Sequence, residues 1–359
     1  MRAAVLWEVG EALEVRDDVE LADPGPGEVR VRIAVSGICH SDVSIQDGSV
    51  PQPLPSVLGH EGAGEVVALG DGVERVREND HVVLIWSPPC GYCPDCLGGQ
   101  PNLCLEIAQR EPGANRRRAN GKDISALAGL GTFAEEVIVP QEAVIPIPAD
   151  IPFDAASLLG CGVMTGAGAA INTAKVQPGS SVAVIGCGGV GISVIQGARI
   201  CGAAEIVAVD IQPEKIELAK SFGATHGSTP DQLSELSAEI TGGRGFDYVF
   251  EALGRAETVR AAYDATRRGG AAVIVGLTTS GATVEFGAIE LPLYEKKILG
   301  SLYGSADVRR DVNRLLRLYR TGRLDLDRMI SRRINLKDVN DGMETCARGI
   351  GIRSVIEFD

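Results

Sequence analysis

The sequence predicts an α/β protein with two parts, a β-rich part that carries functional loops and a doubly wound parallel sheet. Two patterns support this. Before about residue 150, short apolar runs alternate with turns rich in Pro and Gly. After Pro152, strand-like and helix-like segments alternate, which is typical of a parallel sheet with helices on its faces. A final apolar run, Ser354–Phe358, is expected to pack back on the first part.

In the first part, Val29–Val35 alternates as expected of a half-buried strand. Gly64–Leu69 and His81–Ile85 predict further short strands, and Pro24–Gly27 predicts a turn. In the second part, strands and helices follow one another in pairs. The predicted strands are Ser181–Ile185, Glu205–Val209, Asp247–Glu251 and Ala271–Val275, and the predicted helices are Val190–Cys201, Pro213–Phe222, Ala256–Thr266 and Asp307–Thr321.

The chain is acidic, with a formal net charge of −14, which argues against nucleic acid and anionic membrane surfaces as partners. Its one basic cluster, Arg116–Arg118, is expected to be a solvated loop face. No secretory signal is visible, and the uncharged stretch Val176–Ala198 contains Pro178 and a nucleotide fingerprint, so we do not interpret it as a membrane span. Nine cysteines without an export signal indicate a reducing compartment, and we expect a cytoplasmic protein.

A glycine-rich pattern, G-x-G-x-x-G, directly follows the first strand of the second part. It consists of Gly186, Gly188 and Gly191, with Gly189 and Val190 inside it. The first glycine permits a tight turn, the second lets the backbone approach a pyrophosphate, and the third lets the helix pack on the sheet. The helix N-terminus then offers unpaired N–H groups to the phosphates. The alternative is a glycine-rich turn without a ligand.

An acidic residue, Asp210, ends the next strand, where a carboxylate can bind the ribose hydroxyls of adenosine. Because this carboxylate would repel a 2′-phosphate, NAD is favoured over NADP. Lys215 lies about one helical turn further on and could add a contact to the ribose. The second part is therefore predicted to bind NAD.

Four cysteines lie in one short loop with the spacing C-x2-C-x2-C-x7-C. They are Cys90, Cys93, Cys96 and Cys104. Four thiolates this close can converge on one tetrahedral Zn2+.

A second possible metal set, Cys39, His60 and Cys161, is dispersed along the chain. Two thiolates and one imidazole suit a catalytic zinc with an open fourth position. Taken from the residues alone, the alternative is two packed cysteines and a histidine with ordinary hydrogen bonds.

Together with GHEGAGEVVALG, GCGVMTGAGAA, VIGCGGVG and GIRSVIEF, these motifs make the chain resemble the zinc-containing medium-chain alcohol dehydrogenase family over nearly its full length. The resemblance implies a GroES-like catalytic domain at residues 1–162 and 303–359, with a structural zinc lobe at about 88–106, and a Rossmann NAD-binding domain at 163–302. It implies two zinc ions per subunit. Cys39, His60 and Cys161 would hold the catalytic ion, and the four lobe cysteines would hold the structural one.

The resemblance also assigns roles close to the catalytic zinc. Ser41 matches a hydroxyl that relays the proton of the alcohol, although it could instead cap a helix. Asp42 matches a carboxylate that orients the zinc-bound imidazole. Glu61 matches a glutamate behind the zinc that can transiently coordinate it, with a simple buried ion pair as the alternative. Ser44 departs from the pattern, because several relatives carry at this position a histidine that completes the relay.

Further residues are matched to the cofactor and substrate. His40 and Arg353 match positions near the pyrophosphate, with a plain surface charge as the alternative for Arg353. Thr165 matches a position near the nicotinamide, and Leu277 matches one near the cofactor and the substrate wall. Trp86 matches a residue of the substrate channel, where an indole would favour apolar substrates, or it belongs to the core. Val50 and Leu130 are further candidates for the channel.

The resemblance implies reversible hydride transfer between a primary or secondary alcohol and NAD. The long stretch from Cys104 to Phe133 resembles the branch that contains liver and formaldehyde dehydrogenases, so a homodimer is expected and a homotetramer is the alternative. This branch raises a rival substrate, a thiol–formaldehyde adduct. The anion-binding arginine that such enzymes use falls here on Ala108, with Arg110 close by. A remote alternative is a protein that binds zinc and NAD without turnover.

Overall fold

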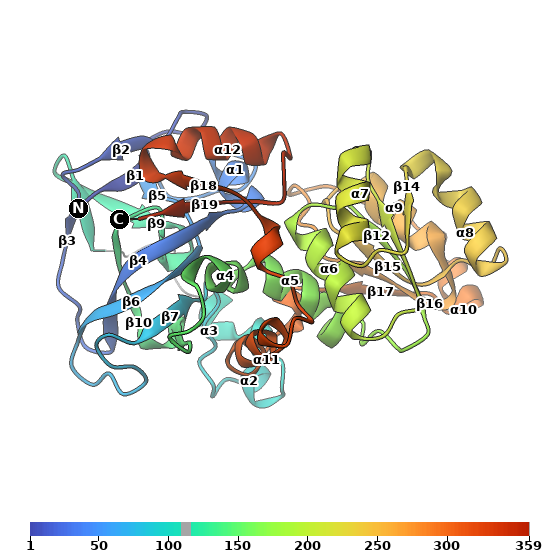
Figure 1. The fold of residues 1–359 in the computed structure, drawn as a ribbon, viewed down its shortest axis with the longest axis horizontal. Coiled ribbons are helices and arrows are strands. Elements are labelled where there is room, and N and C mark those ends of the chain that lie inside the picture. Colours follow the sequence, from blue (N-terminus) through green and yellow to red (C-terminus); the bar gives the residue numbers. More distant parts are fainter. Residues whose placement is uncertain (109–115, 359) are drawn as a thin grey trace. The chain divides into compact units, whose positions relative to one another are not determined.

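The computed structural model describes residues 1–108 and 116–358, and the chain forms two compact units. Unit 1 comprises Met1–Cys161, Asp307–Arg314 and Leu326–Asp359, and unit 2 comprises Gly162–Ala306 and Leu315–Asp325 (Figure 1). Each unit has its own sheets and its own buried core.

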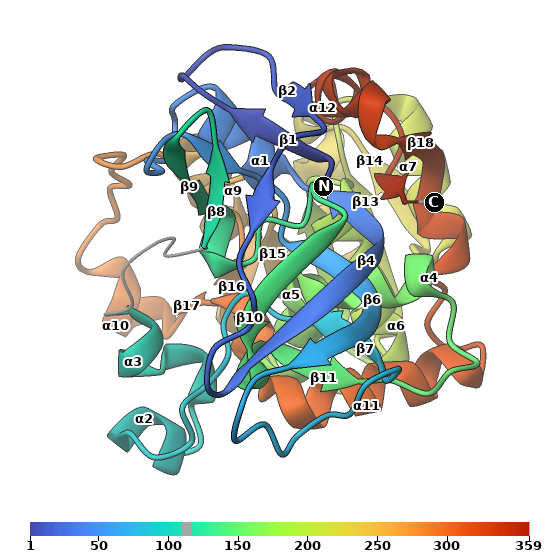
Figure 2. The same cartoon turned by 90° about the vertical axis from the view of Figure 1, so that its left-hand side faces the viewer.

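The main sheet of unit 1 has β4 (Glu28–Ile38) at its centre (Figure 2). β4 pairs antiparallel with β6, β10 and β19, and the sheet order is β11-β7-β6-β4-β19-β18 with β10 also on β4. The other strands of this sheet are β6 (Glu61–Leu69), β7 (His81–Leu84), β10 (Glu136–Pro140), β11 (Val144–Pro146), β18 (Ile330–Asn335) and β19 (Arg353–Glu357).

The second sheet of unit 1 has the order β2-β1-β5-β9-β8-β3. Its strands are β1 (Ala3–Leu6), β2 (Glu14–Arg16), β3 (Glu20–Leu21), β5 (Ser56–Val57), β8 (Arg117–Ala119) and β9 (Lys122–Ala126). Short helices accompany the two sheets: α1 (His40–Gln46), α2 (Pro94–Leu97), α3 (Leu105–Ala108), α4 (Phe153–Ser157) and α12 (Val339–Ala347). α12 packs against α1 and β19, close to where the chain ends (Figure 1).

Unit 2 contains one parallel sheet with the order β14-β13-β12-β15-β16-β17. Its strands are β12 (Ser181–Ile185), β13 (Glu205–Val209), β14 (His226–Ser228), β15 (Phe246–Glu251), β16 (Thr266–Ile274) and β17 (Lys297–Gly300). Its helices are α5 (Gly162–Gly168), α6 (Gly189–Ile200), α7 (Pro213–Ser221), α8 (Leu233–Thr241), α9 (Ala256–Ala265) and α10 (Glu290–Tyr294), while α11 (Val308–Arg320) begins in unit 1 and ends in unit 2.

The strand order of unit 2 reverses between β12 and β15. Such a reversal opens a crevice at the carboxyl ends of the two strands, where dinucleotides bind in Rossmann sheets. The buried strands consist mainly of Val, Ile and Ala, as expected when helices cover both faces of a parallel sheet. The predicted fold class is therefore confirmed.

Most predicted elements are present with small shifts at their ends. The strands predicted at Ser181–Ile185 and Glu205–Val209 have those bounds. The helix predicted at Pro213–Phe222 ends at Ser221, because Phe222 is its C-cap. The C-terminal run forms β19, which pairs with β4 and so packs on the first part of the chain, as predicted.

The arginine cluster corrects one prediction. Arg117 lies in β8 and is only 1% exposed, so it does not belong to a solvated loop face. Its guanidinium donates to the carbonyl oxygens of Gly131 and Glu136, at 3.0 and 2.9 Å. Burial lowers the pKa of Arg117 to about 9. The cluster alternates as a strand does, so that only its outer members, Arg116 and Arg118, are exposed.

Among the described residues, no single helix has the length and apolar character needed to cross a membrane. Only the bent pair Phe153–Gly160 and Gly162–Thr173 meets both criteria, and only when the two segments are taken together.

Candidate active site and metal centres

Strand register brings the dispersed donors of unit 1 together. Cys39 follows the last residue of β4, and His60 precedes the first residue of β6, Glu61. In the antiparallel ladder Gly37 lies opposite Glu61, so these two strand ends meet at one edge of the sheet. Cys161 follows the short segment after α4, in which Gly160 lies close to β7 and β6: a Cβ at Gly160 would lie 2.8 Å from the carbonyl oxygen of Leu84 and 3.5 Å from that of His60.

These residues form a compact group of possible metal ligands. One donor atom from each of Cys39, His60, Glu61 and Cys161 lies within 4.8 Å of every other. Cys39, His60 and Glu61 are buried and Cys161 is half-buried. Two sulfurs, an imidazole nitrogen and a nearby carboxylate are ligand types that Zn2+ accepts in tetrahedral sites. The donor chemistry of the two sulfurs and the imidazole therefore fits zinc, with the Glu61 carboxylate close by.

Asp42 holds the loop ends of this group in place. Its fully buried carboxylate accepts hydrogen bonds from the backbone N–H groups of Cys39 and Gly59, both at 2.9 Å. The same carboxylate lies 3.5 Å from Nδ1 of His60. Burial opposes protonation of His60, but the Asp42 carboxylate and the Cys39 sulfur raise its pKa well above the usual value. Asp42 therefore lies beside one nitrogen of the imidazole without a hydrogen bond to it, and its role in orienting a zinc-bound ring stays a prediction from the resemblance.

The sulfur atoms of Cys39 and Cys161 shift each other's pKa in opposite directions. A hydrogen bond from Cys161 lowers the pKa of Cys39 well below the usual thiol value, against the effect of burial, and Arg353 and His60 add to the lowering. The same hydrogen bond, together with burial, raises the pKa of Cys161. Because metals bind thiolates, a divalent cation would displace a thiol proton and make affinity dependent on pH.

A buried ion pair lies behind the donors. Nη2 of Arg353 is 3.0 Å from Oε1 of Glu61 and 3.8 Å from Sγ of Cys39. Glu61 is 0% exposed and Arg353 is 7% exposed, so Arg353 is not a surface charge. Gly37 leaves the space for this carboxylate, since a Cβ there would collide with Oε2 of Glu61. The sequence singled out both charged residues but not their pairing, which depends on β4 pairing with β6 and β19.

The structure places the remaining residues predicted for this site in different settings. Ser41 is half-buried, with its Oγ 3.8 Å from Sγ of Cys39. It is not a helix cap, because Cys39 is the N-cap of α1 and Asp42 supplies the capping carboxylate. His40 and Val50 are exposed. Trp86 is half-buried against the core cluster that contains the buried Leu130.

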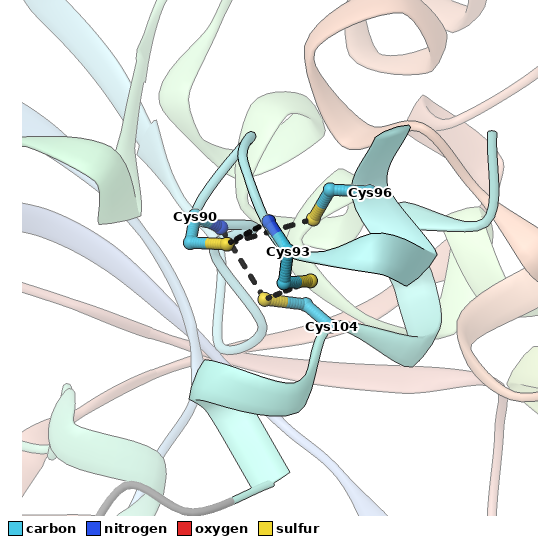
Figure 3. A group of neighbouring side chains, drawn as sticks. All are labelled: Cys90, Cys93, Cys96 and Cys104. Atoms are coloured by element: carbon cyan, nitrogen blue, oxygen red, sulfur yellow. Dashed lines mark hydrogen bonds between the residues drawn. The ribbon is translucent and has the colours of Figure 1, made fainter. Parts of the chain in front are cut away.

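The four lobe cysteines converge at a second site (Figure 3). Their sulfur atoms lie within 4.8 Å of one another. Backbone N–H groups surround them: those of Tyr92 and Cys93 donate to Sγ of Cys90, at 3.5 and 3.3 Å, and that of Cys90 donates to Sγ of Cys104, at 3.4 Å. Backbone hydrogen bonds from Cys96 and Leu105 lower the pKa of Cys93 to about 6, against burial.

These N–H···S hydrogen bonds stabilise thiolates and so prepare the lobe for a cation. A closed set of four sulfurs leaves no open position for substrate, which is characteristic of structural zinc. Ala108, the position matched to an anion-binding arginine, is the last residue of α3, and Arg110 lies outside the described residues.

The glycine pattern of unit 2 turns from β12 into α6. Gly186 has a φ of 96°, which favours glycine, and Gly188 is the N-cap of α6. A Cβ at Gly191 would collide with the carbonyl oxygen of Gly186, so only glycine lets the helix approach the strand here. A Cβ at Gly188 would meet no atom within 4 Å, so this face of the turn is open. Gly189 and Val190 form the first turn of α6, beside this open face.

Asp210 lies directly after β13 and faces the same turn. Its carboxylate accepts hydrogen bonds from the backbone N–H groups of Cys187 and Gln212, at 2.9 and 3.0 Å. Lys215 is half-buried in the first turn of α7. Thr165 is half-buried in α5, and Leu277, just after β16, is 77% exposed. The acidic residue and the glycine turn therefore form one edge of the sheet, where a dinucleotide would bind.

Comparisons with known proteins agree with this geometry. The family model described as an alcohol dehydrogenase GroES-like domain matches residues 25–149, and that of the zinc-binding dehydrogenases matches residues 189–320. A Mycobacterium tuberculosis protein, provisionally named alcohol dehydrogenase D, is 40% identical over 99% of this chain and 98% of its own length. The S-(hydroxymethyl)glutathione dehydrogenase of Paracoccus denitrificans is 38% identical, with 99% of each chain covered.

Among solved structures, the benzyl alcohol dehydrogenase of Acinetobacter calcoaceticus is 33% identical, with a TM-score of 0.93, and the match covers 100% of this chain and 99% of that one. The chain therefore belongs to the zinc-containing medium-chain alcohol dehydrogenases, on the branch that includes formaldehyde dehydrogenases. It is an oxidoreductase that acts on CH–OH groups of small molecules, and its family uses zinc and a nicotinamide cofactor.

Two glycine substitutions should separate packing from cofactor binding. Gly191→Ala should destabilise the fold by about 1–3 kcal/mol, because the added methyl collides with backbone. Gly188→Ala should leave the thermal midpoint nearly unchanged and weaken NADH binding by about tenfold, because its methyl would stand where the pyrophosphate approaches. Thermal unfolding and NADH fluorescence titration measure the two effects. Equal NADH affinity in wild type and Gly188→Ala would contradict the placement of the phosphates.

Proposed function

We propose that this protein is a zinc-dependent alcohol dehydrogenase that transfers a hydride reversibly between primary or secondary alcohols and NAD. The observation that carries the proposal is the buried convergence of Cys39, His60 and Cys161, with Asp42 oriented toward the imidazole. A purely structural site would close its coordination with four protein ligands, as the lobe does, whereas this set offers three strong donors and one carboxylate already paired with Arg353.

Each donor set is proposed to hold one zinc ion, giving two ions per chain. When bound, zinc in the three-residue set supplies a Lewis acid that makes an alcohol more acidic, and NAD+ accepts the hydride. The protein's own groups supply orientation. Asp42 keeps the imidazole of His60 directed at the metal position, and it also fixes the backbone of Cys39 through the hydrogen bond from its N–H.

Ser41 is the proposed first carrier of the proton that the alcohol loses. Its Oγ lies 3.8 Å from Sγ of Cys39, and its side chain is half-buried, so the hydroxyl is close to the donor set and partly accessible to solvent. Ser44 is one helical turn further along α1 and is also half-buried. A hydroxyl there is a weaker base than an imidazole, so the later steps of proton release should depend more on water than in relatives with histidine.

Glu61 and Arg353 are proposed to tune the charge of the metal site. The guanidinium is shared between the Glu61 carboxylate and the Cys39 sulfur, and therefore offsets part of the negative charge of the ligands. Glu61 could approach a cation if this ion pair loosened. While the ion pair is intact, it holds the Glu61 carboxylate beside Arg353.

NAD is the proposed cofactor, bound at the Gly186–Gly191 turn with Asp210 on the ribose. The carboxylate already accepts hydrogen bonds from two backbone N–H groups, which hold it in a position to repel a 2′-phosphate. The roles of Lys215, Thr165, His40, Leu277 and Arg353 toward the cofactor stay predictions from the resemblance. The same holds for the domain limits given above.

The preferred substrates are proposed to be apolar alcohols, with Trp86, Val50 and Leu130 as candidates for the channel. The similarity to a benzyl alcohol dehydrogenase supports this choice. The rival substrate is a thiol–formaldehyde adduct, which the similarity to S-(hydroxymethyl)glutathione dehydrogenases favours. An alanine at position 108, where the resemblance expects an anion-binding arginine, favours the first candidate, because the carboxylates of the adduct need cations.

A homodimer is the proposed assembly, formed through unit 2. Among the strands of residues 1–108 and 116–358, β17 pairs only with β16, and Ile289, Leu293 and Ile298 expose apolar surface nearby. An unpaired strand edge flanked by apolar side chains can pair with a second copy. Sedimentation velocity measures the subunit number directly, and a stable monomer would contradict this assembly. A reducing cytoplasm is the proposed location, because none of the nine cysteines, all of which lie in the described residues, forms a disulfide bond.

Cys161→Ser and Cys93→Ser form a matched pair for the two metal roles. Cys161→Ser should remove about one zinc ion per chain and lower turnover by about a thousandfold or more, with little change in the thermal midpoint. Cys93→Ser should also remove about one zinc ion but lower the thermal midpoint by several degrees, because structural zinc contributes folding free energy. Metal analysis, calorimetry and initial rates measure these effects. Retained turnover in Cys161→Ser would contradict the ligand assignment.

A substrate panel tests the function itself. Initial rates of NADH formation should be measured with zinc-loaded protein, NAD+ or NADP+, and ethanol, long-chain alcohols, benzyl alcohol and S-(hydroxymethyl)glutathione. We expect turnover of benzylic and longer alcohols with NAD+ and much slower rates with NADP+. Turnover of the adduct alone would favour the formaldehyde rival. No turnover of any alcohol with either cofactor would contradict the proposed function.

A further inference from the structure

A buried carboxylate lies at the switch point of the parallel sheet in unit 2. Glu251 is the last residue of β15, the strand beside β12 where the sheet order reverses. Its side chain is 0% exposed, and within residues 1–108 and 116–358 no cationic side chain forms an ion pair with it. Burying an unpaired carboxylate is costly, and of its two oxygens only Oε1 accepts hydrogen bonds from the described residues, whereas Oε2 is buried without a hydrogen-bond partner among them.

One oxygen of Glu251 holds the turn that follows it. Oε1 accepts hydrogen bonds from the backbone N–H groups of Leu253 and Gly254, at 2.9 and 2.8 Å, and from the hydroxyl of Thr258, at 2.7 Å. Hydrogen bonds to a charged acceptor are about twice as strong as neutral ones. The carboxylate therefore restricts the backbone of residues 252–254 more strongly than the backbone of an exposed loop is restricted.

The backbone of the same residue joins two neighbouring strand ends. The carbonyl oxygen of Glu251 accepts the N–H groups of Val275 and Gly276, at 2.9 and 3.0 Å, and Ala252 donates to the carbonyl of Ile185, at 2.9 Å. Three segments at the carboxyl edge of the sheet, those after β12, β15 and β16, are thus connected through Glu251 and the residue after it.

Close glycine contacts leave these segments no free space. Gly254 has a φ of 79°, and a Cβ there would collide with the carbonyl oxygen of Leu277. A Cβ at Gly276 would collide with the backbone nitrogen of Gly254 and would lie 2.7 Å from Oε2 of Glu251. On the other side, a Cβ at Gly186 would lie 2.8 Å from the Leu253 side chain. The turn of residues 252–254 therefore packs closely against Gly186 on one side and against Gly276, just after β16, on the other.

We propose that Glu251 is a positioning residue for the nicotinamide cofactor, one that holds the 252–254 turn against Gly186 on one side and Gly276 on the other. This inference rests on the proposed NAD-dependent function. In the proposed role, Glu251 acts through the 252–254 turn and does not itself contact the cofactor. Its carboxylate sets the shape of the crevice at the switch point before the cofactor arrives, which lowers the entropy cost of binding. Leu253 and Leu277 are both exposed, and they are the apolar side chains that the segments held by Glu251 place at the carboxyl edge of the sheet.

The test uses Glu251→Gln in the full chain, with Glu239→Gln, an exposed change of the same charge in α8, as the matched control. The glutamine keeps the shape and one acceptor oxygen but loses the charge. We expect the dissociation constant of NADH to rise about tenfold in Glu251→Gln, and the amides of residues 252–254 to exchange faster with deuterium. KM for NAD+ should rise more than kcat falls, and zinc content should be unchanged. Glu239→Gln should match wild type throughout.

Wild-type NADH affinity and amide protection in Glu251→Gln would overturn the positioning role. If Glu251→Gln does not fold, Gly276→Ala serves instead, since its methyl presses on Gly254 and on Oε2 of Glu251 and should weaken NADH binding similarly. Unchanged affinity in that variant would overturn the proposal as well. Failure of the wild type to bind NADH would refute the proposed function, an outcome distinct from a wild type that binds and a variant that binds equally well.

Discussion

The antiparallel pairing of β4 with both β6 and β19 is the constraint on which the rest of unit 1 depends. It places Gly37 opposite Glu61 and Ile38 opposite Ser354, so that three segments distant in sequence end at one edge. The donors Cys39 and His60 and the cation Arg353 follow directly from this register. A slip by one residue would turn every side chain to the other face of the sheet and disperse the group.

The buried charges at that edge are balanced by an ion pair and by hydrogen bonds from backbone N–H groups. Glu61 and Arg353 pair in a space that Gly37 leaves open, and Asp42 accepts two backbone N–H groups beside His60. Buried ion pairs often contribute little net stability, so the presence of this pair beside a donor set points to function more than to folding. Glu251 in unit 2 is the contrasting case, because its compensation comes from backbone and hydroxyl donors rather than from a cation.

Local patterns predicted most elements because each is determined by its own residues. The parallel strands are apolar runs flanked by glycine or proline, and the metal lobe is one loop whose spacing alone brings four sulfurs together. The Cys39, His60 and Cys161 set was ambiguous from its residues, since only long-range pairing unites them. These three residues were predicted from their ligand chemistry and from the family resemblance. The register of β4 with β6 explains why Cys39 and His60 lie together.

The features that the sequence did not predict depend on strand geometry and on contacts between distant segments. Arg117 was expected in solvent because its neighbours are arginines, but a strand alternates its sides and turns the middle residue inward. Ser41 was an alternative helix cap, but the helix begins at His40, so its N-cap is Cys39, two residues before Ser41, and Asp42 completes the cap. The Glu61–Arg353 pair and the clamp at Glu251 depend on contacts between distant strands, which no local pattern contains.

Zinc K-edge X-ray absorption of the purified, zinc-loaded protein tests the central claim most directly, because it counts the ligands of the bound metal without relying on activity. Four thiolates at one ion and two at the other predict an average of about three sulfur ligands per zinc, together with an imidazole contribution. An average of about four sulfur ligands without imidazole would mean that only the lobe binds zinc, and it would contradict the metal site formed by Cys39, His60 and Cys161.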